Sequence, residues 1–180
     1  VYDRFMGLLE PAVQGVKVMS PGDDAAEMGP LISAKQRETV TSYVEGDGVD
    51  VAFRGHAPDG AGFWYPPTVV LPKTDQDRVW REEVFGPVVA VLPFDDEADA
   101  IAKANDTEYG LSGSIWTRDV GRAIRVSRGV ETGNLSVNSH ASVRYSTPFG
   151  GFKQSGIGRE LGPDALDPFT ELKNVFISHE

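Results

Sequence analysis

Alternation between two hydrophobic periods, over residues 88–137, restricts the fold of this chain more than any other feature. Short apolar, partly β-branched runs typical of strands alternate there with segments whose apolar side chains recur at helical spacing. In order, these segments are 88–92 (strand), 95–105 (helix), 112–117 (strand), 120–128 (helix) and 134–137 (strand). Strands that alternate with helices are usually parallel and joined by right-handed crossovers. The sequence therefore predicts an α/β fold built on a parallel sheet.

The first third of the chain carries two helix signals. Residues 3–14 place apolar side chains on one helical face, with Asp3 as the expected N-cap. Pro11 lies inside this pattern and should kink or end the helix near Leu9. The tetrapeptide Ser-Ala-Lys-Gln at 33–36 is a capping box and predicts the start of a second helix. Two more strands are expected, at 49–53 and 68–71.

Composition excludes several classes of function. The formal net charge of the 180 residues is −10, which disfavours a nucleic-acid partner. Cysteine is absent, so this chain contains no disulfide, no zinc–thiolate site and no thiol nucleophile. The three histidines lie far apart and match no metal-ligand spacing. Because no apolar run approaches 18 residues and no signal peptide is evident, we expect a cytoplasmic protein without a membrane partner.

Two adjacent carboxylates precede an aromatic ring in the stretch from Arg81 to Pro87. Glu82 and Glu83 come first, then Phe85, and a Gly-Pro turn leads into the apolar run 88–92. This arrangement predicts a carboxylate and a ring at the edge of a sheet, where open α/β folds bind ligands. The alternative is a solvated glutamate pair beside a core phenylalanine.

Four segments of the chain resemble the aldehyde dehydrogenase superfamily. They are Glu82-Glu-Val-Phe-Gly-Pro87, Asn105-Asp-Thr-Glu-Tyr-Gly-Leu111, Gly133-Asn-Leu-Ser-Val-Asn138 and Pro148-Phe-Gly-Gly-Phe-Lys-Gln-Ser-Gly-Ile-Gly-Arg-Glu-Leu-Gly162. They occur in one order within a resemblance that covers essentially the whole chain. The resemblance implies the C-terminal part of that fold, with part of the catalytic domain at 1–168 and an oligomerisation strand at 169–180.

Enzymes of this superfamily oxidise an aldehyde to a carboxylate with NAD or NADP. The resemblance implies that a cysteine thiolate attacks the aldehyde, a hydride passes to the nicotinamide, and a glutamate activates the water that releases the acid. The cysteine, this glutamate and the Rossmann half are expected before Val1. We therefore expect the chain alone to be inactive, to need the N-terminal half as partner, and to form homodimers or tetramers.

The resemblance also assigns four residues to the cofactor. Glu83 matches a carboxylate that accepts hydrogen bonds from the nicotinamide ribose, and Phe85 matches a ring that packs beside it. A carboxylate can accept from two neighbouring hydroxyls, and a ring fixes a plane without competing for them. Gln36 matches a weaker cofactor contact. Leu111 matches an apolar residue near the nicotinamide, with a core position as the alternative.

The expected substrate is a small-molecule aldehyde. Asn138 and Phe149 match residues that line the substrate tunnel, although Asn138 has a second interpretation as the end of its strand. The loop 139–147 should border the tunnel mouth, and loops of this kind set specificity. His140 and Arg144 make this loop polar, which favours a small polar or charged aldehyde such as a semialdehyde or an amino-aldehyde.

Further roles are implied near the C-terminus. Glu160 matches a carboxylate that relays protons from the catalytic base; the alternative is an ion pair with Arg159. Glu171 resembles a residue that steadies a subunit interface, paired with Arg159. The carbonyls of Lys153 and Gly156 match a monovalent-cation site, and no other metal site is expected.

Two other functions fit the same sequence. One is a non-catalytic oligomerisation or binding module on this scaffold. The other is a member of the superfamily that passes its acyl group to coenzyme A. The sequence upstream of residue 1 separates the first from an enzyme, and product analysis with and without coenzyme A identifies the second.

Overall fold

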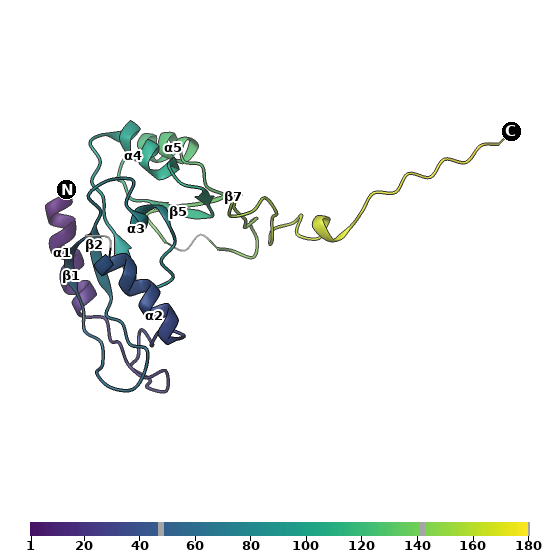
Figure 1. Cartoon of the computed structure of the whole chain (residues 1–180). Helices are drawn as coiled ribbons and strands as arrows, with labels where there is room; N and C mark the ends of the chain where they lie inside the picture. The colour runs from purple at the N-terminus through teal and green to yellow at the C-terminus, as the bar shows by residue number, and fades with distance from the viewer. Residues whose placement is uncertain (47–48, 141–142, 180) are drawn as a thin grey trace. The chain divides into compact units, whose positions relative to one another are not determined.

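The computed structural model describes residues 1–46, 49–140 and 143–179 (Figure 1). The chain divides into two compact units, Val1–Pro93 and Phe94–Glu180, each of which has its own internal packing. The functional division expected between residues 168 and 169 stays a prediction. Within the described ranges, no helix combines the length and the apolar character that a membrane span requires.

A small mixed sheet forms the centre of the first unit. The elements of this unit are α1 (Tyr2–Gln14), α2 (Ala34–Thr41), the π-helical turn η1 (Ser42–Gly46), β1 (Asp50–Arg54), β2 (Thr68–Leu71), α3 (Arg78–Arg81) and β3 (Val88–Ala90). Strand β2 lies in the middle, antiparallel to β1 and parallel to β3, with Thr68 opposite Val88. The strand predicted at 68–71 is confirmed.

Helix α1 continues through its internal proline. It begins after Val1, not after Asp3, and it ends at Gln14, so of the two outcomes expected from Pro11, a kink or an end near Leu9, the end is wrong. A proline removes one N–H donor and leaves its own carbonyl available. The N–H of Gly15 still donates to the Pro11 carbonyl (3.0 Å), and the helical ladder resumes beyond the missing bond.

The core of the first unit lies where α2 and η1 pack on the sheet. Its buried members are Val40, Tyr43, Val44, Val49, Tyr65, Val70, Val79 and Val84. Val40 is fully buried and occupies the space that a side chain at Gly86 would need. Glycine at 86 therefore lets the turn before β3 approach α2 closely, and this packing fixes where the turn lies.

A polar cluster ties η1 to the same turn. The hydroxyl of Tyr43 donates to Oε2 of Glu82 (2.6 Å), while Nε of Arg78 donates to Oε1 (3.2 Å). The Arg78 guanidinium also lies over the Tyr43 ring, 4.3 Å from its centre. The hydrogen bond from Tyr43, followed by that from Arg78, lowers the pKa of Glu82 below its ordinary value. Glu82 is thus an ionised anchor for this turn.

The second unit contains a parallel strand pair joined by a helix. Its elements are α4 (Glu97–Asn105), β4 (Tyr109–Gly110), β5 (Ser112–Ile115), α5 (Val120–Gly129), β6 (Asn134–Val137), β7 (Phe152–Lys153) and the 3₁₀ turn η2 (Asp167–Phe169). Strands β5 and β6 are parallel, and β4 pairs with β7 in antiparallel register. The predicted order of strands and helices over 88–137 is confirmed.

The pairing of these strands differs from the prediction. Strand β3 pairs with β2, whereas β5 pairs with β6 in a separate sheet. The single parallel sheet expected over residues 88–137 is therefore not formed. Hydrophobic periodicity identifies a strand, but contacts far away in the sequence select the strand with which it pairs.

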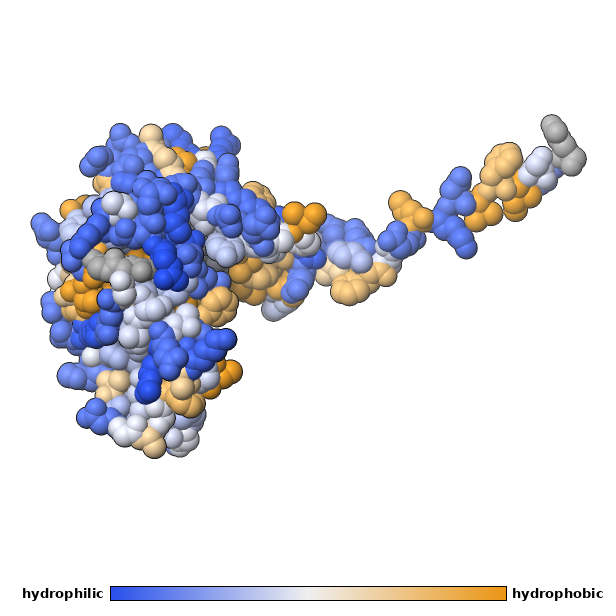
Figure 2. Space-filling view, in the orientation of Figure 1, coloured by the Kyte–Doolittle hydropathy of each residue, from blue (hydrophilic) through white to orange (hydrophobic). Residues whose placement is uncertain are grey.

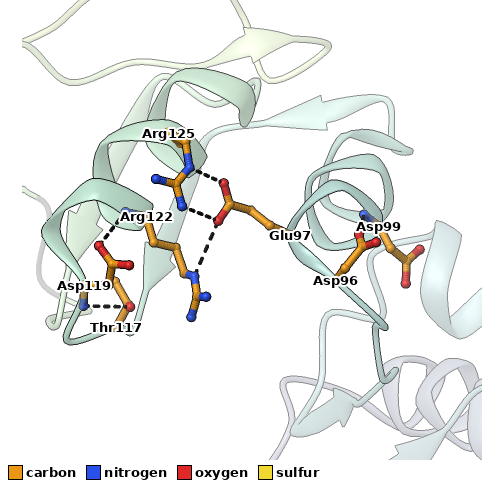
Figure 3. A network of polar contacts seen from close by, with 7 residues as sticks. All are labelled: Asp96, Glu97, Asp99, Thr117, Asp119, Arg122 and Arg125. Carbon is orange, nitrogen blue, oxygen red and sulfur yellow. Dashed lines mark hydrogen bonds and ion pairs between the residues drawn. The ribbon is translucent and has the colours of Figure 1, made fainter.

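Ion pairs join α4 to α5 in the second unit (Figure 3). The Glu97 carboxylate forms two bonds with the guanidinium of Arg125 (2.7 and 2.9 Å), and Arg122 lies 3.4 Å away. The bonds from Arg125 lower the pKa of Glu97. Each helix begins at an aspartate that accepts from the backbone, Asp96 for α4 and Asp119 for α5. The helix expected over 95–105 is confirmed as α4.

The C-terminal segment 170–179 contains no helix or strand. Its apolar side chains are open to solvent (Figure 2). They are Leu172, Val175, Phe176 and Ile177. The described part of the tail, which was expected to supply an oligomerisation strand within 169–180, forms no strand within this chain.

The pKa of Glu82 predicts a pH-dependent contribution of Tyr43 to stability. The interaction is fully present above the ordinary glutamate pKa of about 4.3 and is lost as the pH falls through the lower folded value. We expect Tyr43→Phe to unfold at a lower urea concentration than the unsubstituted chain at about pH 7, and this difference to shrink by about pH 3. Tryptophan fluorescence during urea titration measures both midpoints.

Tyr2→Phe is the matched control, since no hydrogen bond links the Tyr2 hydroxyl to the described residues. It should leave the midpoint unchanged at both pH values. A Tyr43→Phe difference that is equal at both pH values would contradict the role of the ionised Glu82.

Candidate functional site

The two adjacent glutamates before β3 have different surroundings. Glu82 is occupied by Tyr43 and Arg78. The side chain of Glu83 is exposed and forms no hydrogen bond or ion pair with any residue that the structure describes. All acceptor positions of its carboxylate therefore remain available to a ligand. Of the two glutamates, Glu82 therefore has a structural role, whereas the carboxylate of Glu83 is not occupied by the described residues.

Phe85 projects its ring away from the core at an unusual backbone conformation. Its φ is +51°, in the left-handed region that residues with a side chain seldom adopt. The neighbouring Val84 is buried in the core, whereas Phe85 is 71% exposed. Such a conformation costs free energy and persists only where the surroundings hold it. The turn thus presents a flat apolar surface beside the free carboxylate of Glu83.

Gln36 links helix α2 to this turn. Its Nε2 donates to the carbonyl oxygens of Val84 (3.1 Å) and Phe85 (3.0 Å). Its backbone N–H donates to Oγ of Ser33 (3.1 Å), which confirms the predicted helix cap. Three of the four predicted cofactor residues, Gln36, Glu83 and Phe85, therefore lie together. The side chain of Gln36 reaches the turn through hydrogen bonds that the sequence did not predict.

Leu111, the fourth predicted cofactor residue, belongs to the second unit. Its side chain is 43% exposed, which agrees with a surface position better than with a core position. Its carbonyl accepts from both the backbone N–H (3.1 Å) and the side-chain amide (2.8 Å) of Asn134. The backbone of Leu111 is therefore fixed while its side chain stays accessible.

Asn138 lies at the end of β6 and holds the end of β5. Its Nδ2 donates to the carbonyl of Thr117 (2.9 Å), and its Oδ1 accepts from the Thr117 N–H (3.0 Å). Its φ of +54° turns the chain away from the strand. These bonds support the strand-terminating interpretation. Asn138 also belongs to the wall of a hollow of about 650 Å³, together with Trp116, Thr117, Arg118, Asp119, Val120, Ala123 and Val137.

The backbones of Phe149 and Glu160 are paired. Each donates its N–H to the carbonyl of the other, at 2.7 Å in both directions. The carboxylate of Glu160 is exposed, and no ion pair with Arg159 occurs among the described residues. The structure therefore brings one predicted substrate residue and the predicted proton relay together, and it leaves the carboxylate of Glu160 free.

Arg159 is used to stabilise its own loop. Its Nη1 donates to the carbonyls of Gly151 (2.9 Å) and Gly158 (2.8 Å). The guanidinium also lies 5.5 Å from the centre of the Phe152 ring. In the part of the chain that the structure describes, Arg159 forms no ion pair with Glu171, so the pairing expected between them is not seen within one chain.

Lys153 reaches back to the loop after α4. Its Nζ donates to the carbonyls of Asn105 (2.7 Å) and Thr107 (3.2 Å) and pairs with Glu131 (2.8 Å). Its carbonyl accepts from the N–H of Gly156 (3.2 Å), so one of the two oxygens proposed for a monovalent cation is already hydrogen-bonded. The described ranges contain no cluster of three or more acidic or histidine side chains that could hold a metal.

His140 and Arg144 flank residues 141–142, which lie outside the described residues. Both side chains are exposed. Nη1 of Arg144 donates to the carbonyl of Val143 (2.8 Å), a local contact that leaves the rest of the guanidinium accessible. The positive charge expected beside the substrate is thus at the surface of this loop.

The family-like segments of the second unit are joined by backbone-directed contacts. The Asn134 amide donates to the carbonyls of Leu111 and Gly150, both at 2.8 Å. A side chain at Gly133 would overlap the carbonyl of Gly150, so only glycine allows these segments to meet. Asn134 lies in one of the family-like segments, but local sequence pattern does not predict this role. Only the residue type points to it, because the side-chain amide of a buried asparagine needs several hydrogen-bond partners.

Sequence reasoning also missed the pair that supports the turn in the first unit. Arg78 and Glu82 are four residues apart and bracket α3, a spacing that predicts an ion pair on a helical turn. Tyr43 lies in η1, outside the turn that it supports. Its hydroxyl partner lies 39 residues away and could not be deduced from local pattern.

A family model with the description "Aldehyde dehydrogenase family" matches residues 1–175 of this chain. Among curated proteins, the betaine aldehyde dehydrogenase of Sinorhizobium fredii is 40% identical over 183 residues, which include 98% of this chain. That of Agrobacterium fabrum is 42% identical over 181 residues. The chain spans 38% and 37% of the length of these two proteins.

Solved structures show the same relationship. A mutant of the aldehyde dehydrogenase from Bacillus cereus matches 98% of this chain with a TM-score of 0.90 at 39% identity, over 36% of its own chain. The Mycobacterium tuberculosis aldehyde dehydrogenase complexed with NAD+ matches 94% with a TM-score of 0.87 at 42% identity, also over 36% of its own chain. The chain therefore belongs to the aldehyde dehydrogenase family.

Proposed function

We propose that this chain is the C-terminal part of an NAD(P)-dependent aldehyde dehydrogenase that oxidises an aldehyde to a carboxylate. The observation that carries this proposal is the contrast at the turn before β3. Glu82 has two partners, whereas Glu83 beside it is exposed, has no bonded partner among the described residues and comes two residues before the exposed Phe85. An unoccupied carboxylate and an exposed ring are suited to a ligand with hydroxyls and a flat face.

The nicotinamide ribose fits these two side chains. Its neighbouring hydroxyls can donate to the two oxygens of Glu83, and charge-assisted hydrogen bonds of this kind are strong. The ring of Phe85 would limit the orientation of the sugar and the adjoining nicotinamide without competing for these bonds. The nicotinamide, when bound, would accept the hydride from the substrate. Both NAD and NADP contain this ribose, and the NAD+ complex of a related enzyme favours NAD.

The nucleophile must come from outside these 180 residues. The chain contains no cysteine, so a thiolate that attacks an aldehyde belongs to another part of the enzyme. This chain spans 38% of the length of the Sinorhizobium fredii protein, which agrees with an enzyme that further sequence completes. The partner that this proposal requires is that remaining part, and the cytoplasmic location expected from the sequence stays a prediction.

Glu160 and the tunnel residues complete the proposed chemistry on this side of the enzyme. The exposed carboxylate of Glu160 has no partner among the described residues, so it is free to accept and release a proton. Its backbone pairing with Phe149 would keep this carboxylate next to the wall of the substrate tunnel. Leu111 and Asn138 would contribute an apolar contact near the nicotinamide and a fixed part of the tunnel wall.

A small polar aldehyde is the substrate class that we propose. The loop with His140 and Arg144 presents polar groups, and the similar proteins from Sinorhizobium fredii and Agrobacterium fabrum carry the name betaine aldehyde dehydrogenase. The charge of Arg144 favours an anionic group such as that of a semialdehyde, whereas betaine aldehyde is a cation. The sign of the substrate charge is therefore the property to measure.

Subunit association is the role that we propose for residues 169–180. Apolar side chains between residues 172 and 177 are exposed, and these residues form no strand within the chain, so a strand edge of another subunit could pair with them. Addition to a sheet of another subunit would bury both. Arg159 and Glu171 form no pair within the described chain, which leaves Glu171 available for an interface between subunits. A homodimer or tetramer follows from this proposal.

A hybrid enzyme tests the main proposal. In it, this chain replaces the matching C-terminal part of the Sinorhizobium fredii protein. We expect the purified hybrid to form NADH when aldehyde and NAD are supplied, because the other part provides the thiolate. The 180-residue chain alone should form none. Absorbance of NADH measures both reactions, with aldehyde omitted as the control.

Three results would contradict this proposal. NADH formation by the chain alone would show that no outside thiolate is needed. A folded hybrid that binds NAD but oxidises no aldehyde would instead support a non-catalytic binding module. Products that appear only with coenzyme A would indicate the acylating type.

Glu83→Gln in the hybrid tests the cofactor contact. The substitution removes the charge that strengthens the bonds from the ribose hydroxyls, so we expect the KM for NAD to rise about tenfold or more. Steady-state kinetics at saturating aldehyde measure this change. Glu38→Gln, at an exposed glutamate on α2, is the matched control; it should change the KM for NAD by less than about twofold. Equal effects of both substitutions on KM would contradict the assignment of Glu83.

Arg144→Ala in the hybrid tests the substrate charge. Removal of an exposed cation should lower kcat/KM for an anionic semialdehyde about fivefold relative to a neutral aldehyde of similar size. The ratio for betaine aldehyde should move in the opposite direction. Arg128→Ala on α5, another exposed arginine, is the control and should leave both ratios unchanged. Unchanged ratios in Arg144→Ala would remove this residue from substrate selection.

A further inference from the structure

The backbone of Phe85 needs an external hold. A left-handed φ of +51° is unfavourable for a residue with a side chain. The residue is 71% exposed, so burial of its side chain contributes little toward keeping the conformation. The flanking residues, Val84 in the core and Gly86 against Val40, fix where the turn lies. They leave the orientation of the Phe85 peptide groups to other contacts.

Gln36 makes those contacts. The amide nitrogen of its side chain carries two hydrogens and donates to two successive carbonyls, those of Val84 (3.1 Å) and Phe85 (3.0 Å). Reorientation of either peptide group would break one of these bonds. The hold comes from a rigid element, because Gln36 lies in the first turn of α2 and its N–H bonds the Ser33 cap (3.1 Å).

The same geometry restricts what Gln36 can do for a ligand. Both hydrogens of its amide are engaged, so it cannot donate to a cofactor without giving up part of the turn. Its oxygen alone remains as an acceptor. A direct cofactor contact through the amide nitrogen and the support of Phe85 are therefore competing roles.

We propose that Gln36 is a positioning residue, which holds the Phe85 backbone in its left-handed conformation so that the ring faces the nicotinamide ribose. Gln36 acts through Phe85 and does not need to touch the cofactor. The part that concerns the cofactor rests on the proposed function. The hold on Phe85 is a property of the chain itself and can be measured without any cofactor.

The first experiment measures the backbone of Phe85 in the isotopically labelled 180-residue chain. NMR couplings and chemical shifts report its φ in the unsubstituted chain and in the variants Gln36→Ala and Gln36→Glu. We expect Phe85 to leave the left-handed region in both, since glutamate keeps the size of the side chain but loses both donors. Lys35→Ala, an exposed neighbour on α2, is the control and should keep the original φ. An unchanged φ in both Gln36 variants overturns the proposal.

The second experiment is a double-mutant cycle on NAD affinity in the hybrid. Gln36→Ala should raise the Kd for NAD about fivefold while Phe85 is present, and by less than about twofold in the background of Phe85→Ala. The corresponding kinetic signature is a raised KM for NAD with a smaller change in kcat. An equal increase of Kd in both backgrounds indicates a direct contact between Gln36 and the cofactor and overturns the proposal.

The two experiments separate this inference from the proposed function. A folded, unsubstituted hybrid that does not bind NAD refutes the proposed function, and the cofactor part of the inference is refuted with it. The φ of Phe85 still decides whether Gln36 holds the turn. Normal NAD binding together with an unchanged φ refutes the inference alone.

Discussion

The close packing of Val40 against Gly86 is the constraint on which the candidate cofactor site depends. Val40 is fully buried and takes the place of any side chain at position 86. The turn before β3 is therefore pressed against α2, and the first turn of the same helix delivers Gln36 to the carbonyls of Val84 and Phe85. Tyr43 fixes the start of the turn through Glu82. One helix and the π-turn after it thus determine both the place and the conformation of this turn.

The first unit has a larger buried apolar cluster, and contacts to backbone groups hold the family-like segments of the second unit together. The first unit has an apolar cluster that includes Val40, Val70 and Val84. In the second unit, amides and a lysine bind backbone carbonyls, as Asn134 and Lys153 do, and glycines allow close approach. Such contacts demand particular residue types at particular positions. Much of the resemblance in the second unit therefore reflects structural requirements and not chemistry.

Local signals in the sequence predicted the elements well, whereas contacts between distant residues were beyond them. The cap at Ser33 and the strand β2 follow from their own residues, and both are confirmed. The pairing partners of the strands do not follow from local sequence, because tertiary packing decides which strands pair. Pro11 remained inside a helix since the loss of one hydrogen bond leaves the following ladder intact. At the site, resemblance selected Glu83, but only the bond from Tyr43 to Glu82 gives a physical reason for that choice.

Side chains that have no partner within the described fold indicate positions that serve function and not stability. A fold satisfies the polar groups that it needs, as it does for Glu82, Asn134 and Gln36. Glu83, close to the first of these, has no partner within the described chain, and the ring of Phe85 faces outward at a backbone angle that costs free energy. Neither feature stabilises the chain, so each requires another cause. In the function proposed above, the nicotinamide riboside part of the cofactor would supply one cause for both, because its ribose offers hydroxyls to the carboxylate and its nicotinamide offers a flat face to the ring.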